Sequence, residues 1–238
     1  MTLLEICVDD AAGLAAALAG GADRIELCSV LELGGLTPQP GLMALAAKAS
    51  VPVRAMIRPR GGDFVFSAAD RDAMLFDIEA VRQAGLAGVV LGASLPDGRL
   101  DIALLERLVD TTGEMPRTLH RAFDLVPDIG EAVEQAVALG FDTILTSGRA
   151  RTAREGIEDL ALAHQLADGR LTIMAGSGVT AETAPAILQR VPLSAVHGAC
   201  GEPASPDSAP AQRLDFVSPT RKTTSRDKVK ALKAVLSR

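Results

Sequence analysis

A short run near the middle of the chain combines two arginines with an aspartate, in the order Arg58-Pro59-Arg60-Gly61-Gly62-Asp63. Apolar and longer side chains alternate over residues 53–58, which predicts a strand, and Pro59 ends it because proline has no N–H for the sheet. The glycines then allow a tight loop. Arginine presents a rigid fork of donors that suits carboxylate or phosphate. The run therefore predicts an anion-binding site with Arg58 and Arg60; the alternative is a solvated loop holding an Arg–Asp pair.

A second polar cluster, His120-Arg121-Ala122-Phe123-Asp124, closes a predicted strand at 117–121. Glycine-containing runs follow two later predicted strands, at 143–146 and 171–174. Backbone N–H groups of such loops commonly hold phosphate in parallel barrels. The alternative is that they are only tight turns between strand and helix. The anion-binding residues predicted from these runs are Arg121, Ser147, Gly148, Gly176, Ser177 and Gly178.

The first two predicted strands, at 3–8 and 24–28, share a pattern in which Glu5 and Cys7 recur as Glu26 and Cys28. A period of two places each glutamate on the same face as its cysteine. An isolated buried carboxylate costs several kcal/mol, so it needs a partner, and Arg58 is the predicted one. A glutamate beside a second carboxylate has a raised pKa, which suits proton transfer. The catalytic candidates are Glu5, Glu26, Arg58 and His120; the alternative is an interior ion network that sets strand register.

The thiols indicate a soft metal. Thiolates select Cu(I), zinc or iron–sulfur centres, and the sequence has neither a C-x-x-C nor an H-x-x-x-H pair that would indicate structural zinc. Cys7 and Cys28, one strand apart at similar depth, are the predicted Cu(I) ligands. The alternative is that both are small buried hydrophobic residues.

The elements that must position these residues are eight alternating strands and helices. Strict β–α alternation favours a parallel sheet, and eight units without a G-x-G-x-x-G after the first strand favour a TIM-type (β/α)8 barrel over an open dinucleotide-binding sheet. The catalytic face of such a barrel is the carboxyl end of its strands. We expect one domain spanning 1–238, with a flexible loop at 201–219 that delays the last helix to 225–237.

The amino-acid composition also limits the class of protein and its partners. The 238 residues are 48% hydrophobic, lack Trp and Tyr, and carry a net charge of −6. This balance argues against a nucleic-acid partner, whose footprint is a basic patch. The absence of a cationic leader and of a long apolar run predicts a cytoplasmic protein with no membrane partner. Its three cysteines are then expected to be reduced thiols.

Several of these runs resemble the CutC family, which is named for copper homeostasis. They are Leu4-Glu5-Ile6-Cys7-Val8-Asp9, Gly20-Gly21-Ala22-Asp23-Arg24-Ile25-Glu26-Leu27-Cys28, Gly34-Gly35-Leu36-Thr37-Pro38, Ile57-Arg58-Pro59-Arg60-Gly61-Gly62-Asp63-Phe64, His120-Arg121-Ala122-Phe123-Asp124 and Leu145-Thr146-Ser147-Gly148. The resemblance covers roughly residues 3–200. The sequence differs from the family pattern at Leu119, where phenylalanine is usual, and in the residues after His197.

The resemblance implies a TIM-type barrel, a cytosolic homo-oligomer, and copper binding through Cys7 and Cys28. Family membership is associational, whereas the strand ends carry what an enzyme for an anionic substrate needs. Two hypotheses therefore stay open. One is a copper homeostasis protein that binds Cu(I). The other is an enzyme acting on a small phosphorylated or carboxylated metabolite, with Glu/His acid–base chemistry and Arg anion clamps.

Overall fold

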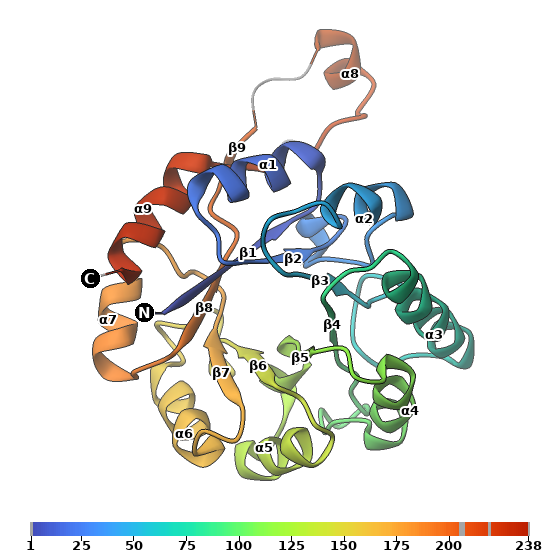
Figure 1. The fold of residues 1–238 in the computed structure, drawn as a ribbon, viewed down its shortest axis with the longest axis vertical. Helices are drawn as coiled ribbons and strands as arrows, with labels where there is room; N and C mark the ends of the chain where they lie inside the picture. Colours follow the sequence, from blue (N-terminus) through green and yellow to red (C-terminus); the bar gives the residue numbers. More distant parts are fainter. Residues whose placement is uncertain (1, 205–207, 219, 238) are drawn as a thin grey trace.

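Eight parallel strands close into a barrel with the helices arranged around it, as the computed structural model shows (Figure 1). The structure describes residues 2–204, 208–218 and 220–237. The predicted TIM-type barrel is confirmed, and neighbouring strands follow chain order, with the eighth beside the first. The strands are β1 Leu3–Val8, β2 Arg24–Leu27, β3 Val53–Met56, β4 Gly88–Leu91, β5 Arg117–Leu119, β6 Thr143–Thr146, β7 Thr172–Ala175 and β8 Ala195–Gly198.

The helices begin where capping side chains allow. Asp10 caps α1 by accepting the N–H of Gly13 at 2.6 Å, and Ser67 and Asp70 form a capping box at the start of α3. Such caps satisfy N–H groups that have no partner inside the helix. The covering helices are α1 Ala11–Gly20, α2 Pro40–Ala46, α3 Ala68–Gln83, α4 Ile102–Thr112, α5 Ile129–Ala138, α6 Ile157–Ala167, α7 Ala184–Arg190 and α9 Arg226–Leu236.

The strands are buried on both faces, although polar side chains alternate with apolar ones along several of them. On β1, Leu4, Ile6 and Val8 are fully buried in the main core between barrel and helices. Glu5 and Cys7 alternate with them and occupy the barrel interior. The predicted strand phase is therefore correct, and it places both glutamates inside.

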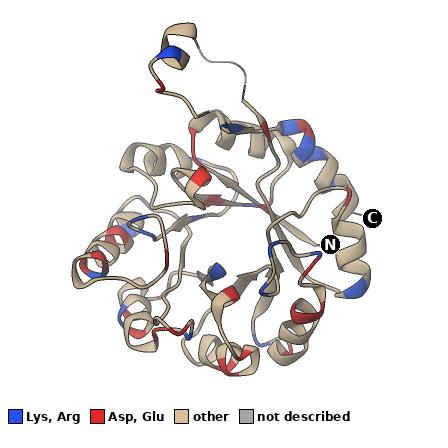
Figure 2. Cartoon of the chain, turned by 180° about the vertical axis from the view of Figure 1, so that it is seen from behind, with Lys and Arg blue, Asp and Glu red and all other residues tan. Residues whose placement is uncertain are grey.

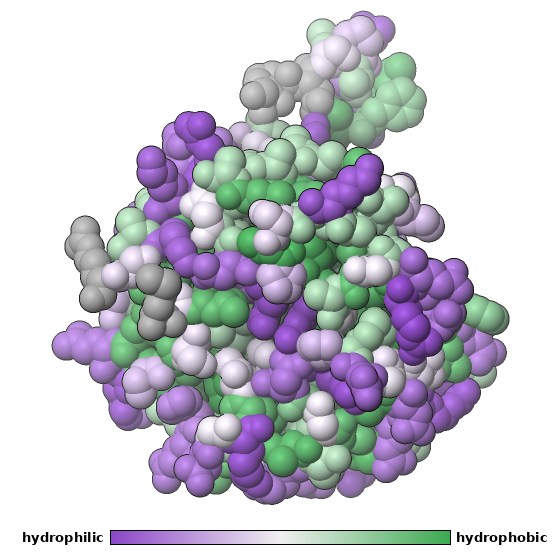
Figure 3. Space-filling model, viewed as in Figure 1, coloured by the Kyte–Doolittle hydropathy of each residue, from purple (hydrophilic) through white to green (hydrophobic). Residues whose placement is uncertain are grey.

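The segment after β8 differs from the predicted loop. It contains β9 (Gly201–Pro203), which pairs antiparallel with β10 (Lys222–Thr224), and a short helix α8 (Ala209–Arg213). Residues 205–207 and 219 of the predicted loop lie outside the described residues. The part carrying α8 projects beyond the ring of helices (Figure 1), and Figure 3 shows hydrophobic residues beside hydrophilic ones on it.

Charge lies mainly on the outside of the barrel. Lys and Arg intermingle with Asp and Glu along the outer helices (Figure 2), as the exposed pair of Arg190 and Glu158 at 2.6 Å illustrates. In the described part of the chain, no helix has the length and apolar character needed to cross a bilayer.

Helix α9 completes the ring by packing against α1, and Gly20 lies close against it. A Cβ added at Gly20 would lie 2.5 Å from the Cβ of Val229. We expect Gly20→Ala to lower the free energy of unfolding by about 1–3 kcal/mol, as overpacking does, in urea denaturation. Gly41→Ala is the matched control, because its added Cβ meets nothing within 4 Å. Equal stability of the two variants would contradict this packing.

Candidate functional site

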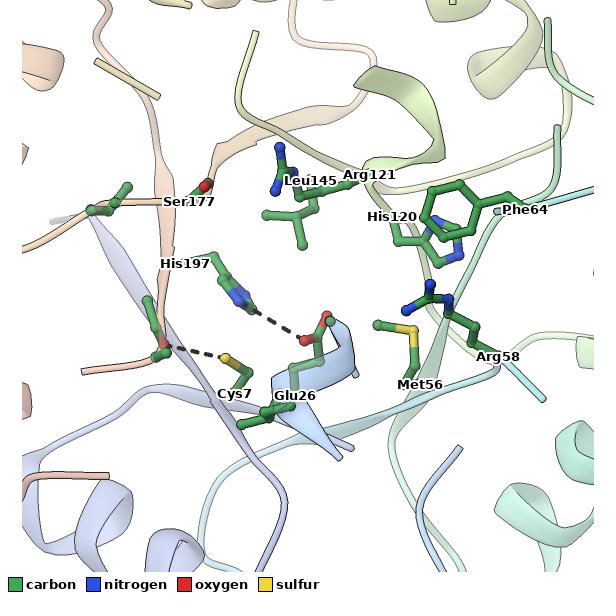
Figure 4. A pocket seen from close by; sticks show the side chains of 16 residues that line it. Cys7, Glu26, Met56, Arg58, Phe64, His120, Arg121, Leu145, Ser177 and His197 are labelled. Atoms are coloured by element: carbon green, nitrogen blue, oxygen red, sulfur yellow. Dashed lines mark hydrogen bonds and ion pairs between the residues drawn. The ribbon is translucent and has the colours of Figure 1, made fainter. Parts of the chain in front are cut away.

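A cavity of about 340 Å³ opens where the strands end at the barrel mouth (Figure 4). It gathers side chains that lie far apart in the sequence, including Glu26, Arg58, His120 and His197. The convergence of Glu26, Arg58 and His120 that the barrel predicts is confirmed, whereas Glu5 does not line the cavity. Cys7, Met56, Phe64, Arg121, Leu145, Ser177 and Gly178 also line it.

The register of neighbouring strands brings three potential metal ligands together. Cys7 on β1 is level with Glu26 on β2, and His197 comes from β8 on the other side of β1. One ligand atom from each of the three residues lies within 4.8 Å of the other two, and all three residues are buried. The Cys7 thiol donates to the Gly198 carbonyl at 3.8 Å. The group presents sulfur, nitrogen and oxygen donors to one point.

Glu5 contacts the Cys7–Glu26–His197 group through His197. Its Oε1 lies 2.9 Å from His197 Nδ1, and its Oε2 accepts from Arg24 Nε at 2.5 Å. Burial alone would raise the pKa of Glu5, but hydrogen bonds and charges from His197 and Arg24 lower it to about 2. Glu5 is therefore an ionised acceptor that orients the His197 ring, with Nε2 3.9 Å from Glu26 Oε2.

The predicted partnership of Arg58 with the two glutamates is wrong. Arg58 donates instead to backbone carbonyls of the loops around it, those of Leu33 at 2.9 Å, Gly35 at 3.2 Å and Gly62 at 2.6 Å. Its guanidinium also lies 4.9 Å from the Phe64 ring centroid. The arginine that compensates Glu5 is Arg24, because Arg24 on β2 is in register with Glu5 on β1. Through these hydrogen bonds, Arg58 connects two loops that surround the mouth.

Glu26 is the less satisfied carboxylate. Its Oε1 is buried and has no hydrogen-bond partner among the described residues, and its Oε2 is 3.9 Å from His197 Nε2. Burial raises its pKa, against the charge of His197, and the charge of Glu5 raises it further. A buried acid of this kind is suited to hold or pass a proton near neutral pH.

The pKa of His197 is raised as well, which favours its protonated form. Burial alone would lower its pKa, but the charges of Cys7 and Glu26 and the hydrogen bond to Glu5 raise it well above its usual value. The imidazole thus lies among three negatively charged or ionisable groups, and a cation bound there would replace its proton.

Cys28 is separated from the other predicted copper ligand. It packs in an apolar cluster with Met56 and Val90, and it does not belong to the group formed by Cys7, Glu26 and His197. Its thiol lies 3.5 Å from Glu26 Oε2. Burial, together with the charge of Glu26, raises the pKa of Cys28 well above its usual value. The thiols of Cys7 and Cys28 therefore differ in their surroundings, although both point into the barrel from neighbouring strands.

The predicted anion-binding residues divide into two sets. Arg58, Arg121, Ser177 and Gly178 line the cavity, whereas Arg60, Ser147, Gly148 and Gly176 do not. Arg60 pairs with Asp63 and Asp70, both at 3.1 Å, on the outer side of its loop. The two arginines that the sequence predicts at one anion site therefore lie apart, with Arg58 at the mouth and Arg60 at the surface.

The loop after β6 binds a carboxylate of the chain itself. Asp124 accepts the backbone N–H of Ser147 at 3.0 Å and of Arg149 at 3.1 Å, and the Thr146 hydroxyl at 2.5 Å. Arg121 Nε pairs with the same carboxylate at 2.6 Å. The loop has the donor geometry that the sequence predicts, but Asp124 occupies those donors.

Some site residues were missed by sequence reasoning. Arg24 is in phase with Glu26 on one strand, so period two was a sufficient signal for its interior position. Phe64 follows directly after the arginine-containing run, but its contact with the Arg58 guanidinium depends on loop folding that no periodicity indicates. His197 lies on β8 and was not among the predicted ligands.

Together, the barrel and its mouth define a TIM-barrel protein with a buried Cys–Glu–His group that lines a small cavity. The CutC family model matches residues 2–202. CutC family proteins of Rhizobium meliloti (strain 1021) and Caulobacter vibrioides are 54% and 50% identical to this chain. These matches cover 98% of this chain in both cases, and 95% and 98% of the respective relatives. The chain belongs to the CutC family.

Solved structures agree with this assignment. The CutC protein of Streptococcus agalactiae, named for copper homeostasis, superposes with a TM-score of 0.80 at 33% identity, covering 84% of this chain and 99% of that one. The aldolase QR15 superposes with a TM-score of 0.62 at 16% identity, covering 82% and 89% of the two chains. The second similarity shows the fold alone.

Proposed function

We propose that this CutC-family chain binds Cu(I) at the barrel mouth through Cys7 and His197, with Glu26 beside them. The observation that carries the proposal is the buried group of three ligand atoms within 4.8 Å of one another. Thiolate sulfur is a soft ligand that selects Cu(I), and imidazole suits copper as well. Glu5 occupies His197 Nδ1 at 2.9 Å, which leaves Nε2 as the ligand nitrogen, as in carboxylate-oriented metal sites.

The originally expected pair, Cys7 with Cys28, is the competing ligand set. Glu26 is close to both thiols, since its Oε2 lies 3.5 Å from the Cys28 sulfur. Titrating the reduced protein with Cu(I) against a competing chelator, in wild type and single cysteine variants, separates the two sets. Failure of the wild-type protein to compete would overturn the copper function.

A role in copper homeostasis would follow from such binding. The proposal places the protein in the cytoplasm, where reducing conditions keep cysteines as thiols. It includes no membrane or nucleic-acid partner, in keeping with the mixed charges on the outer helices (Figure 2). It also includes a homo-oligomer, supported by Leu214 and Phe216, which are 58% and 80% exposed on the projecting segment around α8.

A second candidate function is an enzyme that acts on a small phosphorylated or carboxylated metabolite. The specific observation in its favour is that two residues lining the cavity each have a buried polar atom, Glu26 Oε1 and His120 Nε2, with no hydrogen-bond partner among the described residues. A single ion on Cys7 and His197 does not use His120. In this function Glu26 is the acid–base group, Arg121 attracts the anionic part, and Glu5 and Arg58 hold the site in shape.

A thermal-shift screen of carboxylated and phosphorylated metabolites tests this enzyme function. A ligand at a hundred times its Kd stabilises by about 2.7 kcal/mol, which raises Tm by roughly 5–10 °C in a chain of this size. We expect at least one such compound to raise the Tm of wild type, and Glu26→Gln to bind it while losing any turnover. A screen at millimolar concentration in which no compound shifts Tm would contradict the enzyme function.

A further inference from the structure

The loop after β7 has three consecutive backbone N–H groups without a hydrogen-bond partner among the described residues. They belong to Ser177, Gly178 and Val179, and all three residues line the cavity at the barrel mouth. Gly178 is exposed and consists only of backbone atoms, so the part of this residue that lines the cavity is its backbone. The loop at 177–179 therefore has donors that the rest of the described chain does not use.

Hydrogen bonds to the carbonyl groups of this loop fix the direction of its N–H groups. The Ser177 carbonyl accepts the N–H of Ala153 at 2.9 Å, and the Gly178 carbonyl accepts the Thr183 hydroxyl at 2.8 Å. In a planar trans peptide the N–H points opposite to the C=O. The N–H of Gly178 therefore points away from Ala153, and that of Val179 points away from Thr183.

The loop after β6 differs in this respect. Its donors are occupied, because Asp124 accepts the N–H groups of Ser147 at 3.0 Å and Arg149 at 3.1 Å. No carboxylate of the described chain accepts from the N–H groups at 177–179. Successive N–H groups in a turn form a concavity that binds anions. An external anion can therefore bind after β7, whereas the chain supplies its own anion after β6.

Arginine side chains provide positive charge beside this loop. Arg121 lines the same cavity (Figure 4), and its Nε and Nη2 contact Asp124 at 2.6 Å and Ser147 at 2.7 Å. Its Nη1 has no partner in the described part of the chain. The Arg151 carbonyl accepts the Ser177 hydroxyl at 2.7 Å, so Arg151 lies next to the loop, and that residue is exposed.

We propose that the loop at 177–179 binds the phosphate group of a small phosphorylated metabolite, whose remaining part occupies the cavity of about 340 Å³. A phosphate ester has three acceptor oxygens in different directions, so it can accept from the loop and from Arg121 Nη1 together. A carboxylate has two oxygens in one plane. This inference rests on the second candidate function and specifies its ligand class.

Amide spectra of ¹⁵N-labelled wild type locate the anion. Inorganic phosphate, glycerol 3-phosphate and lactate are titrated separately at constant ionic strength. Both phosphates are expected to shift the amide resonances of Ser177 and Gly178 to saturation, with glycerol 3-phosphate about tenfold tighter than lactate, as one more charge-assisted hydrogen bond allows. Saturable shifts confined to other residues, or none at millimolar phosphate, overturn the proposal.

Two substitutions of Gly178 test the loop by charge alone. Its φ is +73°, a conformation that asparagine and aspartate tolerate, and either side chain places the same Cβ 3.2 Å from Thr152 Cγ2. Gly178→Asp should weaken binding of inorganic phosphate at least about tenfold relative to Gly178→Asn, because it adds a like charge beside the ligand. Equal affinity of the two variants would show that phosphate binds elsewhere.

The thermal-shift screen described above separates this proposal from the function on which it rests. If carboxylated metabolites raise Tm and phosphorylated ones neither raise it nor shift the Gly178 amide, the enzyme function stands and the phosphate assignment is wrong. If inorganic phosphate binds at the loop but no metabolite raises Tm, the loop is an ion site only, and the proposal fails together with the enzyme function.

Discussion

Replacing Cys7 with serine is expected to weaken Cu(I) binding by at least about a hundredfold. Loss of a residue that only orients a metal ligand typically costs 10–100-fold in affinity, and Cys7 supplies the only sulfur of the buried group with Glu26 and His197. Serine is nearly isosteric, so the barrel should remain folded. Competition of the reduced protein with a Cu(I)-specific chelator, followed by the chelator's absorbance, measures the change.

Cys28→Ser is the matched control, because Cys28 lies one strand away in an apolar cluster with Met56 and Val90. Its affinity for Cu(I) should stay within a few-fold of wild type. If Cys28→Ser instead loses as much affinity as Cys7→Ser, the two thiols share the ion and His197 is not a principal ligand. If neither variant loses affinity, copper does not bind at the barrel mouth.

Replacing Arg24 with methionine is expected to lower the free energy of unfolding by about 3–5 kcal/mol at pH 7, the usual cost of removing one partner of a buried pair. The side chains of Arg24 and Glu5 are only 9% and 0% exposed, and their contact is 2.5 Å. Methionine preserves most of the volume but leaves Glu5 with His197 alone. Urea denaturation followed by circular dichroism measures the loss.

The loss should depend on pH with a defined sign. The folded-state pKa of Glu5 is about 2, below its ordinary value of 4.5. A depressed acid pKa stabilises the fold above pH 4.5, and this stabilisation disappears as pH falls toward 2. The difference between wild type and Arg24→Met should therefore be full at neutral pH and shrink between pH 4.5 and pH 2.

An exposed ion pair provides the comparison. Arg190→Met removes a partner from Glu158 where the two side chains are 53% and 72% exposed, and such pairs contribute about 0–1 kcal/mol. A loss in Arg24→Met no larger than that in Arg190→Met would show that the Arg24–Glu5 pair is not buried as the structure describes it.

The sequence by itself determined the barrel and the inward direction of its polar side chains. Period two forces Glu5 and Cys7 to one face of β1, while Leu4 and Ile6 on the other face must meet helices. Eight such units in strict alternation leave a closed parallel barrel as the favoured arrangement. The carboxyl ends of the strands then form one mouth, so Glu26, Arg58 and His120 could be predicted to converge there.

Only the tertiary structure decided which of these polar groups are partners. The depth of each side chain in the barrel depends on strand stagger, which no local pattern encodes. Stagger pairs Glu5 with Arg24 rather than Arg58, and closure of the barrel brings His197 of the last strand level with Glu5 of the first. The loop after β6 has the donors of an anion site, but folding places Asp124 against them.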